Sequence, residues 1–219
     1  MKKEELLAIG AALTKTVRKY IKYSENLFSL YRGHTNSSLY RSRRDMFQQT
    51  MKYRPYTIDH AYQGFKIGIG YCDGLCVAAA VLASRLDLNL TEKCYISIFA
   101  VSEGLTENHA FCIIHQDPLL HTYKDNYLVS DDIHKLGLKA RLKNGVICDP
   151  WIYKSSYLSD IDSHLGHAKL YNVTGYYEGE IISKSFSFKI PSNSKKPYKK
   201  IDDFESTMQE IKSEFFYTL

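Results

Sequence analysis

The 219-residue chain has no apolar run of the roughly 18 residues that a transmembrane helix needs. Its first residues, from Met1 to Glu5, are mostly charged and lead into an amphipathic segment, so we expect neither a membrane span nor a cleavable signal peptide. Internal repeats are missing, and the only biased tract is a polar Ser, Lys and Pro segment at residues 191–200. These absences favour one globular domain followed by a linker.

The sequence has few cysteines, and their spacing is irregular. Five is an odd number and no CxxC pair occurs, so we expect no disulfide framework and a reducing compartment such as the cytosol. Cys94, Cys112, His115 and His121 match no familiar zinc spacing. In a regular strand His109 and His115 share one face, whereas Cys112 faces the other side. A zinc site on these strands is therefore the weaker alternative, and we predict no metal and no cofactor.

The net charge of +5 comes largely from residues 15–54, where Lys and Arg are opposed only by Glu25 and Asp45. Arg41, Arg43 and Arg44 form the tightest basic group, and a second lies at residues 195–200. Such groups suit an acidic partner, an anionic membrane or nucleic acid. Because no nucleic-acid-binding motif accompanies them, we favour a solvated basic face and expect no nucleic-acid partner.

Residues 64–86, GFKIGIGYCDGLCVAAAVLASRL, are the most informative stretch. Three glycines precede Cys72, and the apolar residues that follow predict a helix buried on nearly all sides. A cysteine in the first turn of such a helix faces free backbone N–H groups and the positive end of the helix dipole, which favour the thiolate. The alternative is an ordinary packed cysteine, and that is our prediction for Cys76, one turn further along.

The flanking sequence predicts helices first and then a sheet. Residues 3–31 have the spacing of one or two amphipathic helices, and 57–64 form a short helix or an approach loop. Residues 93–101 and 109–115 read as antiparallel strands joined by residues 102–108, and 145–148 as a third strand that ends before Pro150. We expect 117–143 to be a surface insertion with one short strand at 127–129, and 169–190 to add two or three strands.

Three chemical groups follow one another on these elements: Cys72, His109 and Asp149. Thiol catalysis needs a thiolate, an imidazole that takes and returns the proton, and a group that orients the imidazole. His109 is expected at the beginning of one strand and Asp149 at the end of the next, so we predict that the three side chains converge where the N-terminus of the helix meets the sheet. Asp117 is the rival for the third role. His134, His164 and His167 lie in polar stretches, and we expect them to be exposed.

The arrangement resembles the papain-like and transglutaminase-like cysteine enzymes over residues 60–155. The resemblance implies that Cys72 is the nucleophile, His109 the general base and acid, and Asp149 the orienting group, with no cofactor. It implies an oxyanion donor, for which Gln63 and the Cys72 backbone N–H are candidates, and a substrate cleft with Tyr71 and Trp151; Trp151 is equally suited to the core. The matching triplets are Gly70-Tyr71-Cys72, Asn108-His109-Ala110 and Asp149-Pro150-Trp151.

The chain also resembles effectors that bacterial pathogens inject into host cells, including the transglutaminase-like RavJ type. This implies a host protein substrate and transfer, without a cleaved signal, from the bacterial cytoplasm to the host cytoplasm. Residues 202–219, DDFESTMQEIKSEFFYTL, look like a translocation signal or a terminal amphipathic helix.

We therefore expect an α+β fold with a papain-like arrangement. Residues 1–190 form one catalytic domain, with a helical lobe at 1–56 and the nucleophile helix and antiparallel sheet at 57–190, followed by a linker at 191–200 and a helix or signal at 201–219. The expected function is cysteine-dependent acyl transfer on protein amide bonds by a monomer, as a protease, glutamine deamidase or transglutaminase. The alternatives are a non-catalytic papain-like binding module and a basic surface that binds nucleic acid or anionic lipid.

Overall fold

The computed structural model describes residues 1–24, 41–46, 57–85, 92–103, 106–122, 135–171 and 181–190. Predictions for the strand at 127–129, His134, the linker at 191–200 and the segment 201–219 lie outside these residues. None of the described helices is long and apolar enough to cross a bilayer. The elements are α1 (Lys3–Tyr20), β1 (Tyr23–Ser24), α4 (Ile58–Ile67), β2 (Ile69–Gly70), α5 (Cys72–Arg85), β3 (Cys94–Glu103), β4 (Thr106–His115), α6 (Pro118–Thr122), α7 (Lys135–Arg141), β5 (Val146–Asp149), β6 (Lys154–Tyr157), a 3-10 turn (Leu158–Asp160), α8 (Ile161–Tyr171) and β7 (Ile181–Ile190).

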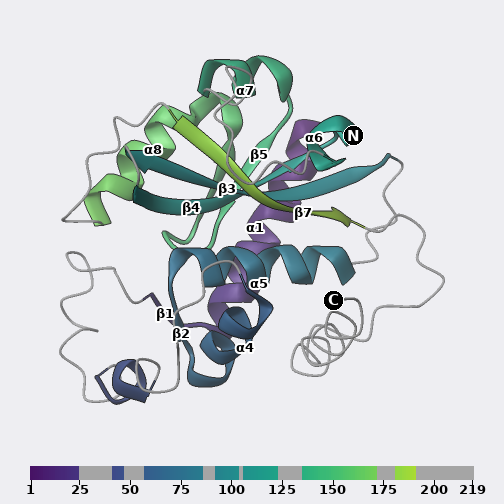
Figure 1. Cartoon of the computed structure of the whole chain (residues 1–219). Coiled ribbons are helices and arrows are strands. Elements are labelled where there is room, and N and C mark those ends of the chain that lie inside the picture. Colours follow the sequence, from purple (N-terminus) through teal and green to yellow (C-terminus); the bar gives the residue numbers. More distant parts are fainter. Residues whose placement is uncertain are drawn as a thin grey trace.

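The larger sheet has the strand order β6-β5-β4-β3-β7, and every neighbouring pair is antiparallel. The expected α+β class with an antiparallel sheet is confirmed at this level. Helices cover both faces of the sheet (Figure 1). α1 and α5 contact one face, and residues of α6, α7 and α8 form a hydrophobic cluster on the other.

Alternation along the strands divides the core between these two faces. On β4, Cys112 and Ile114 pack with α1 and α5, whereas Phe111 and Ile113 pack with α6, α7 and α8. The predicted opposite orientation of Cys112 is therefore confirmed.

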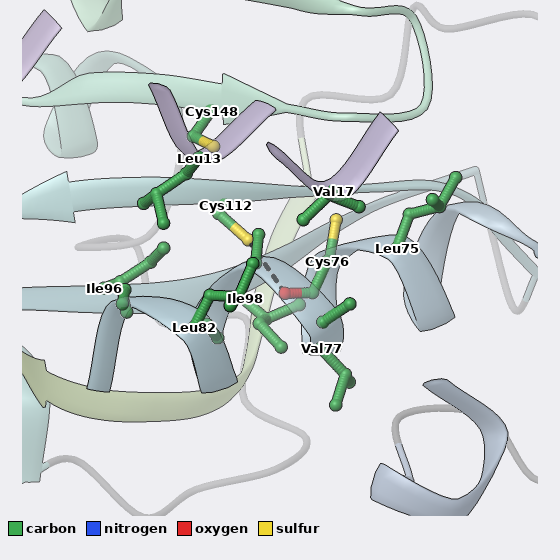
Figure 2. Close-up of a cluster of buried hydrophobic side chains, with 14 of the residues drawn as sticks. Leu13, Val17, Leu75, Cys76, Val77, Leu82, Ile96, Ile98, Cys112 and Cys148 are labelled. Carbon is green, nitrogen blue, oxygen red and sulfur yellow. Dashed lines mark hydrogen bonds between the residues drawn. The ribbon is translucent and has the colours of Figure 1, made fainter. Parts of the chain in front are cut away.

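α5 is the buried helix that the apolar run predicts. Every residue from Leu75 to Ala83 is at most 1% exposed, because α1, α4 and the sheet surround it. Small alanines allow these elements to approach closely. Figure 2 shows Cys76 of α5, Cys112 of β4 and Cys148 of β5 among aliphatic side chains of this cluster, where the Cys112 thiol donates to the Cys76 carbonyl.

The approach to Cys72 is fixed by α4 and two short strands. Thr57 caps the start of α4, and Gly68 ends it with φ of +79°, a conformation that glycine adopts without strain. β2 then pairs in parallel with β1. Arg43, in the helical segment 41–46, donates to the carbonyl of Ile67 at 2.7 Å, which satisfies a carbonyl at the end of α4.

Several predicted boundaries differ from the structure. β4 begins at Thr106, so the prediction that His109 opens a strand is wrong; the hairpin pairing continues into residues 102–108. Within 117–143 the structure has helices α6 and α7. Residues 169–171 are the last residues of α8, so the prediction that a strand begins at residue 169 is wrong. β7 pairs with β3 and extends the sheet, as predicted.

Candidate active site

Cys72 is the first residue of α5, directly after the glycine-led approach. It is half-buried, whereas the other four cysteines are buried. The thiol therefore combines two properties that a nucleophile requires: a place in the first turn of a helix and partial access to solvent.

The predicted partners of Cys72 lie together on neighbouring strands, where His109 is the fourth residue of β4 and Asp149 is the last residue of β5. Nε2 of His109 is 2.6 Å from Oδ2 of Asp149, and both side chains are fully buried. The Cys72 thiol lies near enough to the same imidazole to help raise the pKa of His109. Since Nε2 faces Asp149, Nδ1 is the ring atom left for the thiol. The structure thus brings together all three residues that the sequence predicted.

The pKa values of His109 and Asp149 move in the directions of an ion pair. Burial alone would lower the pKa of His109, but the charge and hydrogen bond of Asp149, with a smaller contribution from Cys72, raise the pKa to about 10. Burial would raise the pKa of Asp149, yet His109 and then His164 hold it well below its usual range. A protonated His109 beside the thiol would stabilise a thiolate.

The turn after β5 fixes the Asp149 carboxylate. Oδ1 accepts hydrogen bonds from the backbone N–H groups of Trp151, at 3.0 Å, and Ile152, at 3.4 Å. Pro150 ends the strand, and the chain folds back over the aspartate. The Asp-Pro-Trp sequence is therefore a device for orienting a carboxylate.

His164 is a fourth member of the site that the sequence reading missed. Its Nε2 is 3.1 Å from Asp149 Oδ2, and its Nδ1 is 2.8 Å from Ser156 Oγ. The expectation that His164 is exposed is wrong, because its side chain is fully buried. The signal was its spacing: His164 shares the apolar stripe of α8 with Ile161 and Leu165.

Asp117, the rival carboxylate, lies at the other end of β4. It pairs with Arg141 and accepts from the Leu120 N–H, and its own N–H donates to His115 Nδ1. Burial would raise the pKa of Asp117, but the hydrogen bond and charge of Arg141 and the backbone N–H donors together lower it. Asp149, not Asp117, is therefore the carboxylate that contacts His109. A cavity of about 370 Å³ borders Asp117 and Arg141 at this distant end.

The residues predicted for the oxyanion site and the substrate cleft differ in how deeply they are buried. Trp151 is 1% exposed and its ring centroid is 4.8 Å from that of His109, so it shields the imidazole and does not line an open surface. Tyr71 is half-buried, with its ring centroid 5.7 Å from that of His60. Gln63 is half-buried on α4.

A second buried histidine–carboxylate pair adjoins the nucleophile. His60 Nδ1 of α4 is 3.1 Å from Oδ2 of Asp73, the residue after Cys72. The pair joins α4 to the first turn of α5. The sequence reading did not single out either residue.

The alternative zinc ligands are not gathered. Cys112 packs on the α5 side, His115 bonds to Ser97 Oγ at 2.8 Å, and His121 stacks on Tyr95. Burial raises the pKa of Cys94 to about 12. Within the described ranges no three His, Cys, Asp or Glu side chains form a group that could hold a metal ion.

The basic group at residues 41–44 is partly used within the fold. Arg43 is half-buried, donates to the Ile67 carbonyl and lies over the Tyr23 ring at 5.8 Å. Arg41 is exposed. The guanidinium of Arg43 is therefore engaged in joining this segment to α4.

In comparisons with known proteins, no family model, curated protein or solved structure matches the chain. The geometry of the site is therefore the basis for a functional proposal.

Proposed function

We propose that the protein is a cysteine-dependent acyl-transfer enzyme of the papain-like or transglutaminase-like type that acts on protein amide bonds. The observation that carries this proposal is the alignment of a partly accessible thiol, a buried imidazole and a carboxylate 2.6 Å from that imidazole. The imidazole has the carboxylate that its proposed role requires, and the nearby thiol is one of the groups that raise its pKa.

In the proposed reaction, His109 takes the Cys72 proton and the thiolate attacks the carbonyl carbon of the amide. The oxygen becomes an oxyanion, for which the Cys72 backbone N–H and the Gln63 side chain are candidate donors. His109 then returns the proton to the departing nitrogen, which leaves a thioester on Cys72. Water or an amine, deprotonated by His109, attacks the thioester and releases the thiol.

Asp149 assists these proton transfers by His109 but does not itself gain or lose a proton. Its ionised carboxylate stabilises the imidazolium that forms when His109 holds the thiol proton. The two backbone donors on Oδ1 keep the other oxygen directed at His109. Trp151, packed against the imidazole, excludes water from the pair and so strengthens it.

Alkylation of the native protein tests the nucleophile. Limiting iodoacetamide at near-neutral pH should add one group, and peptide mapping should assign it to Cys72. Cys72→Ala should abolish the rapid adduct, whereas Cys76→Ala, which removes a buried thiol one turn away, should keep it. Equal labelling of all five cysteines, or none at Cys72, would overturn the proposal.

The acyl acceptor requires a second experiment. Host-cell protein is incubated with wild type or with Cys72→Ala and then analysed by mass spectrometry. Cleaved chains indicate a protease, a gain of about 1 Da per site a deamidase, and cross-linked chains a transglutaminase. If host protein incubated with wild type and with Cys72→Ala differs in none of these ways, a binding module with the same fold would be favoured.

We also propose, from the resemblance alone, that this substrate is a host protein met by a monomeric effector after export from the bacterial cytoplasm. Detection of the protein in the cytoplasm of infected host cells is the test. Salt-sensitive binding of the protein to anionic vesicles or nucleic acid would instead point to a role for its basic surface.

A further inference from the structure

We propose that His164 is a positioning residue of this site: it fixes the Asp149 carboxylate and limits how strongly that carboxylate stabilises protonated His109. The inference rests on the proposed function, because it assigns a role within the same proton path. It adds a residue from α8, the helix layer on the opposite face of the sheet from α5.

The Asp149 carboxylate has a complete set of donors. Oδ2 faces Nε2 of His109 at 2.6 Å and Nε2 of His164 at 3.1 Å. Oδ1 accepts from the N–H groups of Trp151 and Ile152. A carboxylate offers about four acceptor positions, so this one has no direction left in which to turn.

The charge balance indicates that His164 is neutral when His109 is protonated. Both imidazoles are fully buried and share one carboxylate, and a second buried cation would have no counter-ion. A neutral His164 that donates from Nε2 carries no proton on Nδ1. Nδ1 then accepts from the Ser156 hydroxyl, which fixes this tautomer.

A second donor on the same oxygen changes the behaviour of His109. Each N–H group that points at Oδ2 stabilises its negative charge and weakens its attraction for another proton. A general acid must release its proton, here from Nδ1, to the leaving group, and an unmoderated carboxylate at Nε2 would stabilise the imidazolium too strongly for that release. The longer hydrogen bond from His164 Nε2 therefore weakens the attraction of Asp149 Oδ2 for the His109 Nε2 proton.

A purely structural role is the competing explanation. The His164 ring also lies beside Phe111, with centroids 6.4 Å apart, and fills space between α8 and the sheet. If this packing were its whole role, replacing His164 would change stability without changing the hydrogen bond between His109 and Asp149.

Proton NMR at neutral pH separates the two explanations. The His109 Nε2 proton, in a short bond to a carboxylate, should give a strongly deshielded signal that His109→Gln abolishes. His164→Leu should shift it further downfield, because Asp149 then binds that proton more tightly. His164→Gln, which can place an amide N–H near the same oxygen, should restore the wild-type position. His167→Leu is the matched control, since His167 lies on the same helix, is half-buried where His164 is fully buried, and interacts with Asp149 through charge.

The same His109 signal in wild type and in folded His164→Leu would overturn the inference, as would a shift of equal size in His167→Leu. Failure of the proposed function would look different. If iodoacetamide did not select Cys72 while His164→Leu still moved the signal, the coupling would stand without a catalytic role. If Cys72 reacted selectively and the signal did not move, the acyl-transfer proposal would stand without His164.

Discussion

Nε2 of His109 and Oδ2 of Asp149 lie 2.6 Å apart with both side chains fully shielded from solvent. Removing one member of a buried ion pair is more costly than removing an exposed pair, because the remaining charge has lost both water and partner. The His109–Asp149 pair should therefore contribute to stability as well as to chemistry.

Asp149→Asn should lower the free energy of unfolding by about 3–5 kcal/mol, because it replaces an acceptor of two imidazole donors with a neutral amide. Urea unfolding monitored by circular dichroism measures the change. Asp162→Asn is the matched control: Asp162 is 61% exposed in its ion pair with Lys139, and its loss should cost less than about 1 kcal/mol. Equal losses in both variants would contradict a buried ion pair.

The same pair predicts how stability depends on pH. The pKa of His109 is raised from 6.5 to about 10, so its stabilising contribution is complete below pH 6.5 and is lost as the pH rises toward 10. The pKa of Asp149 is lowered from 3.8, so its contribution is present above that pH and is lost as the pH falls below it. Wild type should therefore gain most from the pair between about pH 4 and 6.5.

Unfolding curves of wild type and Asp149→Asn across pH 4–10 test this dependence. Between pH 6.5 and 10 the difference in unfolding free energy should shrink by about 1.4 kcal/mol per pH unit, the value for one linked proton. A difference that stays constant over this range would show that the Asp149 carboxylate does not keep His109 protonated.

The parts of the site that the sequence predicted have strong local signals. Three glycines before Cys72 and the apolar run after it specify a turn and a buried helix within one short stretch. Pro150 marks the end of β5 and so the place of Asp149. In these cases the neighbouring residues determine the backbone and the backbone determines where the side chain lies.

The parts that sequence reasoning missed depend on contacts between distant segments. His164 is buried because α8 lies over the sheet. Its partner Asp149 is 15 positions away, and the residues next to His164 do not indicate this contact. β1 and β2 are two residues each, too short for any periodicity. β4 starts before His109 because backbone pairing with β3 continues through residues whose polarity suggested a loop.

The end of α4 provides a test of the approach to Cys72. Gly68 has φ of +79°, where an alanine costs about 1–2 kcal/mol. An added Cβ would also collide with Arg43 Nη1 and displace its bond to the Ile67 carbonyl, a further loss of about 1 kcal/mol. Gly68→Ala should therefore lower the unfolding free energy.

Gly166→Ala is the control for that change. Gly166 lies on α8, and a Cβ there would meet nothing within 4 Å. Alanine should stabilise the helix by about 0.5–1 kcal/mol. If both variants changed stability in the same direction, the left-handed turn and Arg43 would not be what holds the end of α4.

The two rival carboxylates can be distinguished by the reactivity of Cys72. Asp149→Asn should slow alkylation by iodoacetamide at pH 7 by about tenfold or more, because His109 loses the charge that keeps it protonated beside the thiol. Asp117→Asn should leave the rate unchanged, since it removes a carboxylate that pairs with Arg141 at the far end of β4. The rate is the growth of the singly alkylated mass with time, measured on variants that circular dichroism shows to be folded. A slow Asp117→Asn with a fast Asp149→Asn would transfer the orienting role to Asp117, whereas two unaffected rates would mean that the thiol reacts without help from an oriented imidazole.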